Sequence, residues 1–404
     1  MPRGPQCVSP EPSSILLVLP TWVGDLVMAT PMLRAVRDHF EKARITFVPN
    51  PNLRDLVAGA DWMDECIEWP TGNAATPKRR KLRDEGTEGR GDENQPRTYW
   101  ELVKTLRSRR FDLAILLPNS FRAALIARLS GAKRRMGYDR DGRGFLLTDR
   151  IPVRNRRGLR DASQFPDTVR IGARLPVRLG RYVPMPLVEY YADLAEAVGC
   201  ERPGDRLELF TTPDCEESVQ RRLESLGIAD RHPLIVISPG AKFGASKCWL
   251  PERFAAVADH LIESEGATVI VTCGPGEESI ARAIGAAMKQ DGFLFDSPLL
   301  TLGELKSLVR RSDLLICNDA GPRHIAKAFD VPVVTVFGPT HPDWTSTSYG
   351  DERIVRIDVD CGPCQQRVCP LEHHQCMTGV SMDMVFAAAV ALLHLRTPEH
   401  ARAR

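Results

Sequence analysis

The segment from Leu314 to Pro322 combines a strand, a turn and a helix start with side chains that can bind a ligand. Leu314 to Cys317 is a short apolar run bounded by polar residues, which predicts a strand buried on both faces. Pro322 favours a helix start, because the first helical position needs no N–H. The free N–H groups of that start suit a phosphate, whereas the carboxylate of Asp319 suits sugar hydroxyls. Capping of the helix is an equally good interpretation of Asp319.

A second apolar run follows from Val333 to Phe337 and breaks at a glycine and a proline. Ligands in open α/β sheets lie outside the carboxyl ends of the strands. The candidate binding residues at this edge are therefore Asp319, Gly321, Pro322, Gly338 and Thr340. His324 lies in the first turn of the predicted helix, where it either reaches a phosphate or packs in the core.

Lys247 belongs to a glycine-containing loop that follows another predicted strand. Leu234 to Ile237 is apolar, the loop from Ser238 to Trp249 contains Gly240, and Pro251 opens a helix. Backbone N–H groups with one cationic side chain are a common arrangement for binding a phosphate. The spacing is not that of a Walker A loop, and a solvent-exposed lysine without a ligand is the alternative.

Asp25 stands at the first predicted strand-to-helix turn, after the apolar run from Ile15 to Leu19. The turn has one glycine, Gly24, and lacks the GxGxxG pattern of a dinucleotide site. A carboxylate at a helix start is usually a cap. It can also be a general base that is held ionised and aimed into a ligand site. The sequence leaves both interpretations of Asp25 open.

Asn119 and Ser120 occupy a further ligand-loop position, because they follow the predicted strand from Asp112 to Leu117. The carboxyl end of that strand belongs to the same kind of edge as the turn before Asp25. Ser120 is equally suited to be only the N-cap of the helix that follows.

Four of the eleven cysteines are clustered with the spacing Cys361-x2-Cys364-x4-Cys369-x6-Cys376, and two histidines lie inside the cluster. A CxxC pair with two further ligands is typical of a structural zinc site in a cytosolic protein. The spacing is tighter than in two-hairpin zinc modules, so free thiols are the alternative. A catalytic metal is not favoured.

The order of the apolar runs predicts an α/β protein with two domains. Strands alternate with helices in both halves of the chain, and 404 residues exceed a single core. We expect a disordered tail at 1–13, an N-terminal domain at 14–203, and a C-terminal domain at 204–380 followed by a helix and tail at 381–404. The polar stretch at 72–98 predicts a flexible insertion in the first domain.

The composition argues against a membrane-spanning or disulfide-stabilised secreted protein. The chain is 43% hydrophobic and 26% charged, as in ordinary globular proteins. No apolar run reaches the roughly 20 residues that span a bilayer, and Ile15 to Leu19 is too short for a signal-peptide core. We therefore expect a cytoplasmic protein.

Positive charge is concentrated in one part of the chain. The net charge is only +2, yet the stretch from Arg122 to Arg181 contains sixteen Arg or Lys and five Asp or Glu. This imbalance favours an anionic partner, either an anionic lipid surface or a phosphorylated glycan. Nucleic acid is not expected, because interleaved aromatics and zinc-finger or RNP patterns are absent. A solvated basic face without a partner is the alternative.

Five segments, taken in order, resemble the lipopolysaccharide heptosyltransferases, which have the GT-B fold. They are ILLVLPTWVGDLVMATP at 15–31, LPNSFR at 117–122, SPGA at 238–241 with Lys247 and WLP at 249–251, NDAGPRH at 318–324, and FGPT at 337–340. The tail CGPCQQRVCPLEHHQCM at 361–377 is similar to that of the heptosyltransferase II branch. The resemblance covers about residues 14 to 395.

This resemblance implies an inverting glycosyltransferase that moves heptose from ADP-heptose to a lipid-linked acceptor at the cytoplasmic face of the inner membrane, with no required cofactor. It implies two Rossmann-like domains facing across a cleft, and a C-terminal helix that packs back on the N-terminal domain. Asp25 would be the base, Lys247 would bind the diphosphate, and Asp319 would bind sugar hydroxyls. The other implied substrate-binding residues are Gly24, Asn119, Ser120, Gly240, Gly321, Pro322, His324, Gly338 and Thr340.

Three positions depart from the family pattern. Ala320 stands where serine is frequent, Thr21 where asparagine is common, and Cys248 where an arginine often follows the lysine. The alternative functions are a GT-B enzyme with another nucleotide sugar and a catalytically silent protein of the same fold. The joint presence of Asp25, Lys247 and Asp319 argues against the silent protein.

Overall fold

The computed structural model describes residues 11–70, 95–152, 168–169, 177–178 and 185–395. Two compact units divide the chain. The first contains residues 1–22, 31–153 and 190–204, and the second contains residues 23–30, 154–189 and 205–404. The predicted tail at 1–13 and insertion at 72–98 lie mostly outside the described residues. At the end of that insertion Gln95 is held, because its side chain bonds to the backbone of Glu68 and Cys66 at 2.9 and 3.2 Å.

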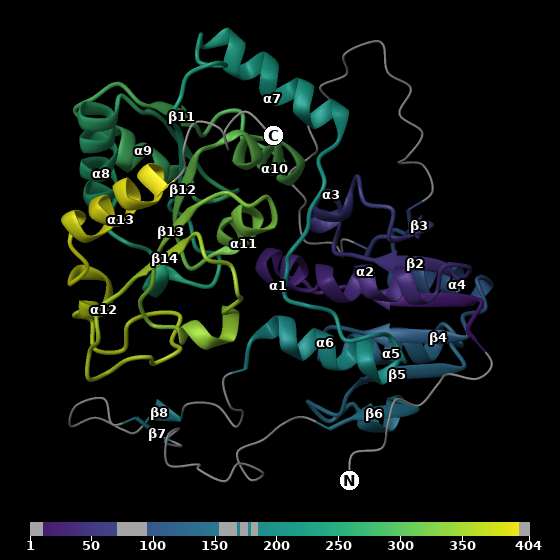
Figure 1. The fold of residues 1–404 in the computed structure, drawn as a ribbon. Helices are drawn as coiled ribbons and strands as arrows, with labels where there is room; N and C mark the ends of the chain where they lie inside the picture. Colours follow the sequence, from purple (N-terminus) through teal and green to yellow (C-terminus); the bar gives the residue numbers. More distant parts are fainter. Residues whose placement is uncertain (1–10, 71–94, 153–167, 170–176, 179–184, 396–404) are drawn as a thin grey trace. The chain divides into compact units, whose positions relative to one another are not determined.

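The first unit contains a six-stranded parallel sheet in the order β3-β2-β1-β4-β5-β6 (Figure 1). Its strands are β1 Ser14–Val18, β2 Arg44–Val48, β3 Glu65–Cys66, β4 Leu113–Leu116, β5 Arg134–Tyr138 and β6 Asp149–Ile151. Its helices are α2 Thr30–His39, α3 Arg54–Val57, α4 Tyr99–Ser108, α5 Phe121–Leu129 and most of α6 Leu187–Ala197, with short 3-10 turns at Pro51–Leu53 and Gly144–Leu146. Helices α4 and α5 share one face of the sheet, where their apolar side chains pack on Leu16, Val18 and Leu116.

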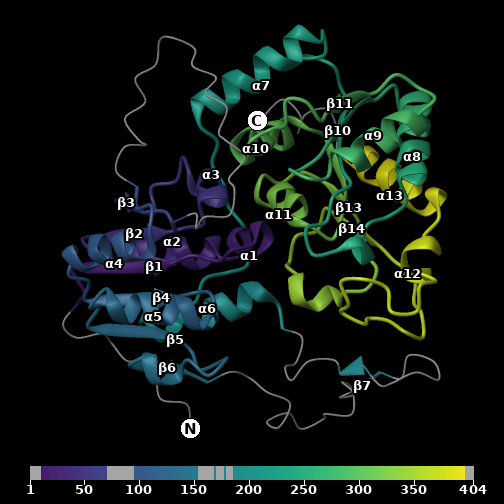
Figure 2. The ribbon, with the colours of Figure 1, turned by 180° about the vertical axis from the view of Figure 1, so that it is seen from behind.

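The second unit repeats the same parallel order, β11-β10-β9-β12-β13-β14 (Figure 2). Its strands are β9 Leu234–Ser238, β10 Thr268–Thr272, β11 Phe293–Phe295, β12 Leu314–Asn318, β13 Val333–Val336 and β14 Glu352–Val355. Its helices are α1 Val23–Met28, α7 Pro213–Ser225, α8 Pro251–Glu265, α9 Glu278–Ala287, α10 Leu302–Arg311, α11 Gly321–Ala328, α12 Gln375–Thr378 and α13 Met382–Leu395. Two short strands, β7 Thr168–Val169 and β8 Val177–Arg178, pair antiparallel. Short 3-10 turns occur at Ala245–Lys247 and Pro342–Thr345.

Both sheets have the doubly wound order in which the first strand of each unit lies next to the fourth, so that ligand positions fall at the carboxyl ends of these two strands. In the first unit these strands are β1 and β4, and in the second they are β9 and β12. The predicted α/β class with two Rossmann-like parallel sheets is confirmed. None of the helices in the described part of the chain is long and apolar enough to cross a bilayer.

The helix expected after Gly24 is broken into α1 and α2 at Ala29. Pro31 has no N–H to donate to the carbonyl of Val27, four residues earlier. The hydroxyl of Thr30 donates to that carbonyl instead, at 2.8 Å. The break separates the short helix that carries Asp25 from the longer helix behind it, and by its contacts α1 groups with the second unit.

The C-terminal helix α13 differs from the expectation. It was expected to pack on the N-terminal domain, but Val385, Ala389 and Leu392 are buried in the core of the second unit together with side chains of α8 and of the sheet. Helix α13 is apolar around most of its surface, so burial against an apolar face is favourable. It covers the same face of the second sheet as α8 and α9.

Candidate active site

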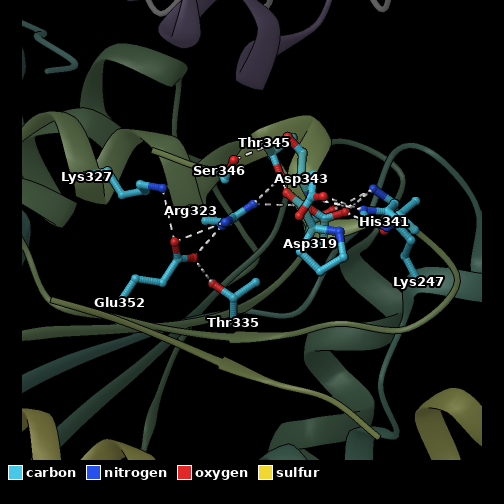
Figure 3. A network of polar contacts seen from close by, with 12 residues as sticks. Lys247, Asp319, Arg323, Lys327, Thr335, His341, Asp343, Thr345, Ser346 and Glu352 are labelled. Carbon is cyan, nitrogen blue, oxygen red and sulfur yellow. Dashed lines mark hydrogen bonds and ion pairs between the residues drawn. The ribbon is translucent and has the colours of Figure 1, made fainter. Parts of the chain in front are cut away.

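Asp319 is the centre of a buried polar cluster at the carboxyl end of β12 (Figure 3). One carboxylate oxygen accepts from Lys247 Nζ at 2.5 Å and from Thr340 Oγ1 at 2.7 Å. Lys247 also donates to the backbone carbonyl of Asp319 at 3.1 Å. The N-cap residue of α11 is Ala320, and Asp319 makes no side-chain cap bond. The cluster therefore brings together the predicted residues Lys247, Asp319 and Thr340 from three separate loops.

A second carboxylate, Glu352 on β14, lies behind this cluster. It accepts from Arg323 Nε at 2.5 Å and from Lys327 Nζ at 3.0 Å, so that it holds two buried cations of α11. Arg323 also approaches Asp319 at 3.5 Å and donates to Thr345 Oγ1 at 2.6 Å. Burial opposes ionisation of Glu352, but the two cations outweigh it and lower the pKa of Glu352 to about 2. The network fixes the start of α11 against β14.

Asn318 connects this site to the loop that carries Lys247. Its side-chain carbonyl accepts from the backbone N–H of Trp249 at 3.2 Å, and its amide nitrogen donates to the carbonyl of Pro239 at 2.5 Å. Asn318 is fully buried, so these bonds satisfy a polar side chain that water cannot reach. The carboxyl ends of β9 and β12 are thereby held together.

Helix α1 packs closely against α11, and glycines make this approach possible. A Cβ on Gly24 would lie 2.9 Å from the ring of His324, and a Cβ on Gly321 would lie 2.5 Å from Val23. Both contacts are too short for any side chain, so these glycines are explained by packing. His324 is buried, and its Nδ1 has no hydrogen-bond partner among the described residues. Burial and the neighbouring cations lower the pKa of His324, which keeps the ring neutral.

Asp25 lies in the first turn of α1 and feels the charge of Lys247. Burial raises the pKa of Asp25 to about 6, although attraction to Lys247 lowers it in part. A carboxylate with this pKa is ionised at neutral pH and is a stronger base than an ordinary aspartate. Asp25, Lys247 and Asp319 therefore belong to one electrostatic site within the second unit.

Two predicted glycines are also explained by close packing. A Cβ on Gly240 would overlap the carboxylate of Glu277, and a Cβ on Gly338 would overlap the sulfur of Met377. Glu277 in turn accepts from the backbone N–H of Gly274 at 3.0 Å. Its carboxylate lies against the Gly240 loop.

Asn119 and Ser120 lie in the first unit, after β4. Ser120 is the N-cap of α5, because its hydroxyl accepts from the N–H of Ala123 at 3.2 Å. The side-chain carbonyl of Asn119 accepts from Tyr190 Oη at 2.9 Å and from Arg143 Nη2 at 3.4 Å. The capping alternative is thus realised for Ser120.

The cysteine cluster lies next to the Lys247 loop. Cys361, Cys364, Cys369 and Cys376 line one small cavity with His373 and His374. His374 Nε2 is 2.7 Å from the carbonyl of Ser246, and Ser246 Oγ donates to the carbonyl of Gln366 at 2.5 Å. Burial, with the neighbouring thiols, raises the pKa of Cys376 to about 11. In the described part of the chain no three His, Cys, Asp or Glu side chains are arranged as a metal site.

The sequence did not single out Arg323, Lys327, Glu352 or Glu277. Arg323 stands inside the quoted 318–324 segment, so its position was visible, but its partner Glu352 lies 29 residues further on. Only the parallel pairing of β13 with β14 brings that carboxylate to α11. Glu277 follows β10 and was visible only as an acidic residue in a turn.

Comparison with known proteins now decides the family. A model of glycosyltransferase family 9 (heptosyltransferase) matches residues 99–162 and 180–375, which is more than half of the chain. This chain belongs to glycosyltransferase family 9. It is 25% identical to lipopolysaccharide heptosyltransferase 2 of Escherichia coli over 94% of this chain and 98% of the relative. It is 26% identical to lipooligosaccharide heptosyltransferase 2 of Haemophilus ducreyi over 92% and 97%.

The solved structure of the E. coli ADP-heptose lipopolysaccharide heptosyltransferase II has the same fold as this family 9 member. The TM-score is 0.69 at 22% identity, with 95% of this chain and 99% of that chain covered. The resemblance stated from the sequence is confirmed. The chain is a glycosyltransferase of the heptosyltransferase family.

Proposed function

We propose that this family 9 enzyme transfers heptose from ADP-heptose to a lipid-linked, anionic inner-core acceptor of lipopolysaccharide and releases ADP. The relatives are named for lipopolysaccharide or lipooligosaccharide, and one solved relative is named an ADP-heptose lipopolysaccharide heptosyltransferase. An acceptor of this kind lies in a bilayer, so we place the reaction at the cytoplasmic face of the inner membrane. The donor would be bound by the second unit.

Asp25 is the proposed general base. The acceptor hydroxyl would give its proton to Asp25 while its oxygen attacks the anomeric carbon of heptose. The bond from that carbon to the diphosphate oxygen breaks, and ADP leaves from the opposite side with inversion. The observation that carries this assignment is the raised pKa of Asp25, to about 6, in the first turn of a helix that packs beside the start of α11.

Lys247 and the start of α11 are the proposed diphosphate site. The leaving ADP gains negative charge, which a lysine and free helix N–H groups stabilise more strongly in the transition state than in the ground state. Asp319 now binds Lys247 at 2.5 Å, and Thr340 occupies the same carboxylate oxygen. In this proposal Lys247 shares its three N–H donors between Asp319 and a phosphate, and Asp319 orients it.

The proposed chemistry uses side chains and backbone N–H groups alone. The predicted structural metal at the cysteine cluster is a separate hypothesis. Four thiols and two imidazoles line one cavity, but among the described residues no three of them are arranged as a metal site, so binding would require them to move. Metal content of the protein purified without chelators tests it. About one zinc per chain, lost in Cys364→Ser, is the expected result, and a metal-free protein that is stable and active contradicts it.

Asp25→Asn tests the base. The change keeps the size and hydrogen bonding of the side chain but removes the proton acceptor, so turnover should fall about 10²–10⁴-fold. ADP-heptose affinity should not fall, because the loss of the Asp25 charge leaves Lys247 at least as free to bind the diphosphate. The wild-type rate should also decline as the pH falls through about 6, because protonated Asp25 accepts no proton.

Asp383→Asn is the matched control. Asp383 also lies in the first turn of a helix, α13, and the change likewise replaces an aspartate by asparagine. It should leave turnover unchanged. Near-normal turnover of folded Asp25→Asn would reduce Asp25 to a helix cap and overturn the mechanism. Product analysis with UDP- and GDP-sugars beside ADP-heptose tests the donor independently.

A further inference from the structure

The outer surface of α4 and α5 in the first unit has an unusual composition for a helical layer exposed to water. Trp100 of α4 is 74% exposed, and Phe121 and Leu129 of α5 are 46% and 38% exposed. Phe145, in the 3-10 turn beside α5, is 65% exposed, and its ring centroid lies 6.0 Å from that of Phe121. Large apolar side chains on the outside of a layer usually mark a contact surface when they are grouped.

Cations are interspersed with these apolar side chains. Lys104 and Arg107 follow Trp100 at helical spacings of four and seven residues, so the three share the outer side of α4. Arg128 follows Phe121 by seven residues on α5 and places a second arginine on the outer side of that helix. Lys104, Arg107 and Arg128 are exposed and have no ion-pair partner in the described parts of the chain.

Between the ends of the two helices the surface is hollowed. An open hollow of about 440 Å³ is lined by Arg107, Arg128, Leu129, Lys133 and Arg135 with two small residues. Burial, followed by repulsion from Arg128, lowers the pKa of Arg135, so like charges are held close together here. From Arg97 to Arg143 the sequence has twelve Lys or Arg and four Asp or Glu. Two of those acids are already occupied, since Asp112 binds Lys133 at 2.8 Å and Glu101 binds the N–H of Arg97 at 2.7 Å.

Complementing the negative ends of the helices is the simpler explanation of Arg107 and Arg128, which lie in the last turns of α4 and α5. That role does not account for Lys104 in the middle of α4, and it does not account for exposed Trp100, Phe121 and Phe145. Trp and Phe beside Arg and Lys are the residues that settle at the boundary between lipid headgroups and acyl chains. Helix α5 carries no acidic residue at all.

We propose that the outer surface of α4 and α5 docks on an anionic phospholipid bilayer. Arg107 and Arg128 meet headgroup phosphates at the hollow, and Trp100, Phe121 and Phe145 enter the interfacial layer. The surface is made of residues of the first unit, whereas Asp25 and Asp319 belong to the second unit. The inference rests on the proposed function only in assuming that the acceptor lies in a membrane. Bilayer binding itself is measured without donor or acceptor.

The test uses the full chain and extruded vesicles of phosphatidylglycerol and phosphatidylcholine, with pure phosphatidylcholine as the neutral control. Co-sedimentation should require phosphatidylglycerol and should weaken strongly between 0.1 and 0.5 M salt, since salt screens exposed charges. Arg107→Ala/Arg128→Ala should weaken binding about 10–30-fold, at roughly one cation's membrane attraction for each change. Brominated acyl chains should quench tryptophan fluorescence in the wild type, and Trp100→Phe should lose most of that quenching.

Two matched variants control the test. Arg231→Ala/Lys289→Ala removes two exposed cations of the second unit that have no ion-pair partner among the described residues, and Val368→Ala removes a side chain that is 71% exposed. Both should bind vesicles as the wild type does. All variants should keep the wild-type melting temperature and the wild-type turnover on a delipidated acceptor, which separates this inference from the proposed reaction.

Three results would overturn the inference. One is equal binding to neutral and anionic vesicles, or no binding to either. Another is a loss of binding in the second-unit controls as large as in Arg107→Ala/Arg128→Ala. The third is a change of oligomeric state, or of affinity for a DNA or RNA oligonucleotide, in Arg107→Ala/Arg128→Ala while vesicle binding stays intact; that would assign the surface to a second copy or to nucleic acid.

Discussion

At the scale of single residues, the position of Asp25 disfavours the ionised carboxylate that the proposed chemistry requires. Burial raises its pKa to about 6, so the folded protein holds the proton more tightly than the unfolded chain does. Between the ordinary value of 3.8 and about 6, unfolding releases a proton. The free energy of unfolding therefore decreases as the pH rises through this window, because the fold favours protonated Asp25. An ionised Asp25 is a cost to folding that a catalytic base can require.

Asp25→Asn should consequently stabilise the protein, and more so at higher pH. The raised pKa corresponds to at most about 3 kcal/mol at pH 8 and roughly half of that at pH 5. Urea unfolding at the two pH values measures the difference. Asp383→Asn should show no such dependence. An equal effect of Asp25→Asn at both pH values would mean that the pKa of Asp25 is not raised.

Residue types alone explain only part of the site. Lys247, Asp319 and Thr340 were predicted as binding residues, and the structure brings them within hydrogen-bonding distance. Gly24 and Gly321 were also predicted as binding residues, yet their neighbours His324 and Val23 show that close helix packing requires glycine there. A single sequence cannot separate a glycine that admits a ligand from one that admits a neighbouring helix, because both need the same missing Cβ.

At the scale of elements, β14 and α11 are joined by an ion-pair network that fixes the start of α11. Glu352 contacts both Arg323 and Lys327, and all three side chains are buried. Removing one partner of a buried ion pair leaves an uncompensated charge. The loss should act on Asp319, since Arg323 approaches its carboxylate at 3.5 Å.

Glu352→Gln should therefore destabilise the protein by about 3–5 kcal/mol and weaken ADP binding through a displaced start of α11. Because the pKa of Glu352 is lowered to about 2, its stabilising effect in the wild type is present above pH 4.5 and is lost as the pH falls toward 2. Thermal unfolding and ADP titration measure both effects. Glu252→Gln, at an exposed position in the first turn of α8, is the matched control. Unchanged stability of Glu352→Gln would contradict the network's role.

Local patterns predicted the elements of the second unit well. The strands at 234–238 and 314–318 and the helices opening at Pro251 and near Gly321 were found close to their expected ends. Apolar runs and helix-start prolines locate such ends to within a few residues. The edge strands β3, β6 and β14 were not predicted. Each is short and half-exposed, so its sequence lacks the continuous apolar run of a central strand.

At the scale of the whole molecule, the α/β fold class was predictable from the sequence. The packing of individual helices against distant parts of the chain was not. Alternation of strands and helices predicts two parallel sheets, and both have the same doubly wound order. The prediction that α13 packs on the N-terminal domain was wrong, because the sequence of an apolar helix does not specify which sheet the helix covers. The grouping of α1 with the second unit was equally invisible, since it depends on the contacts of Gly24 and Gly321 with α11 rather than on chain order.

Donor binding should slow hydrogen exchange in the second unit and not in the first. ADP bound at Lys247 and the start of α11 would restrain the backbone of the two loops that Asn318 joins, because its side chain links Pro239 to Trp249. Hydrogen exchange measured with saturating ADP should slow at 238–250 and 318–325, while 117–122 in the first unit stays unchanged. UDP and GDP at the same concentration serve as controls for the nucleotide. Protection confined to 117–122 would contradict donor binding at the Lys247–Asp319 cluster. Equal protection by all three nucleotides would contradict selectivity for the adenine nucleotide.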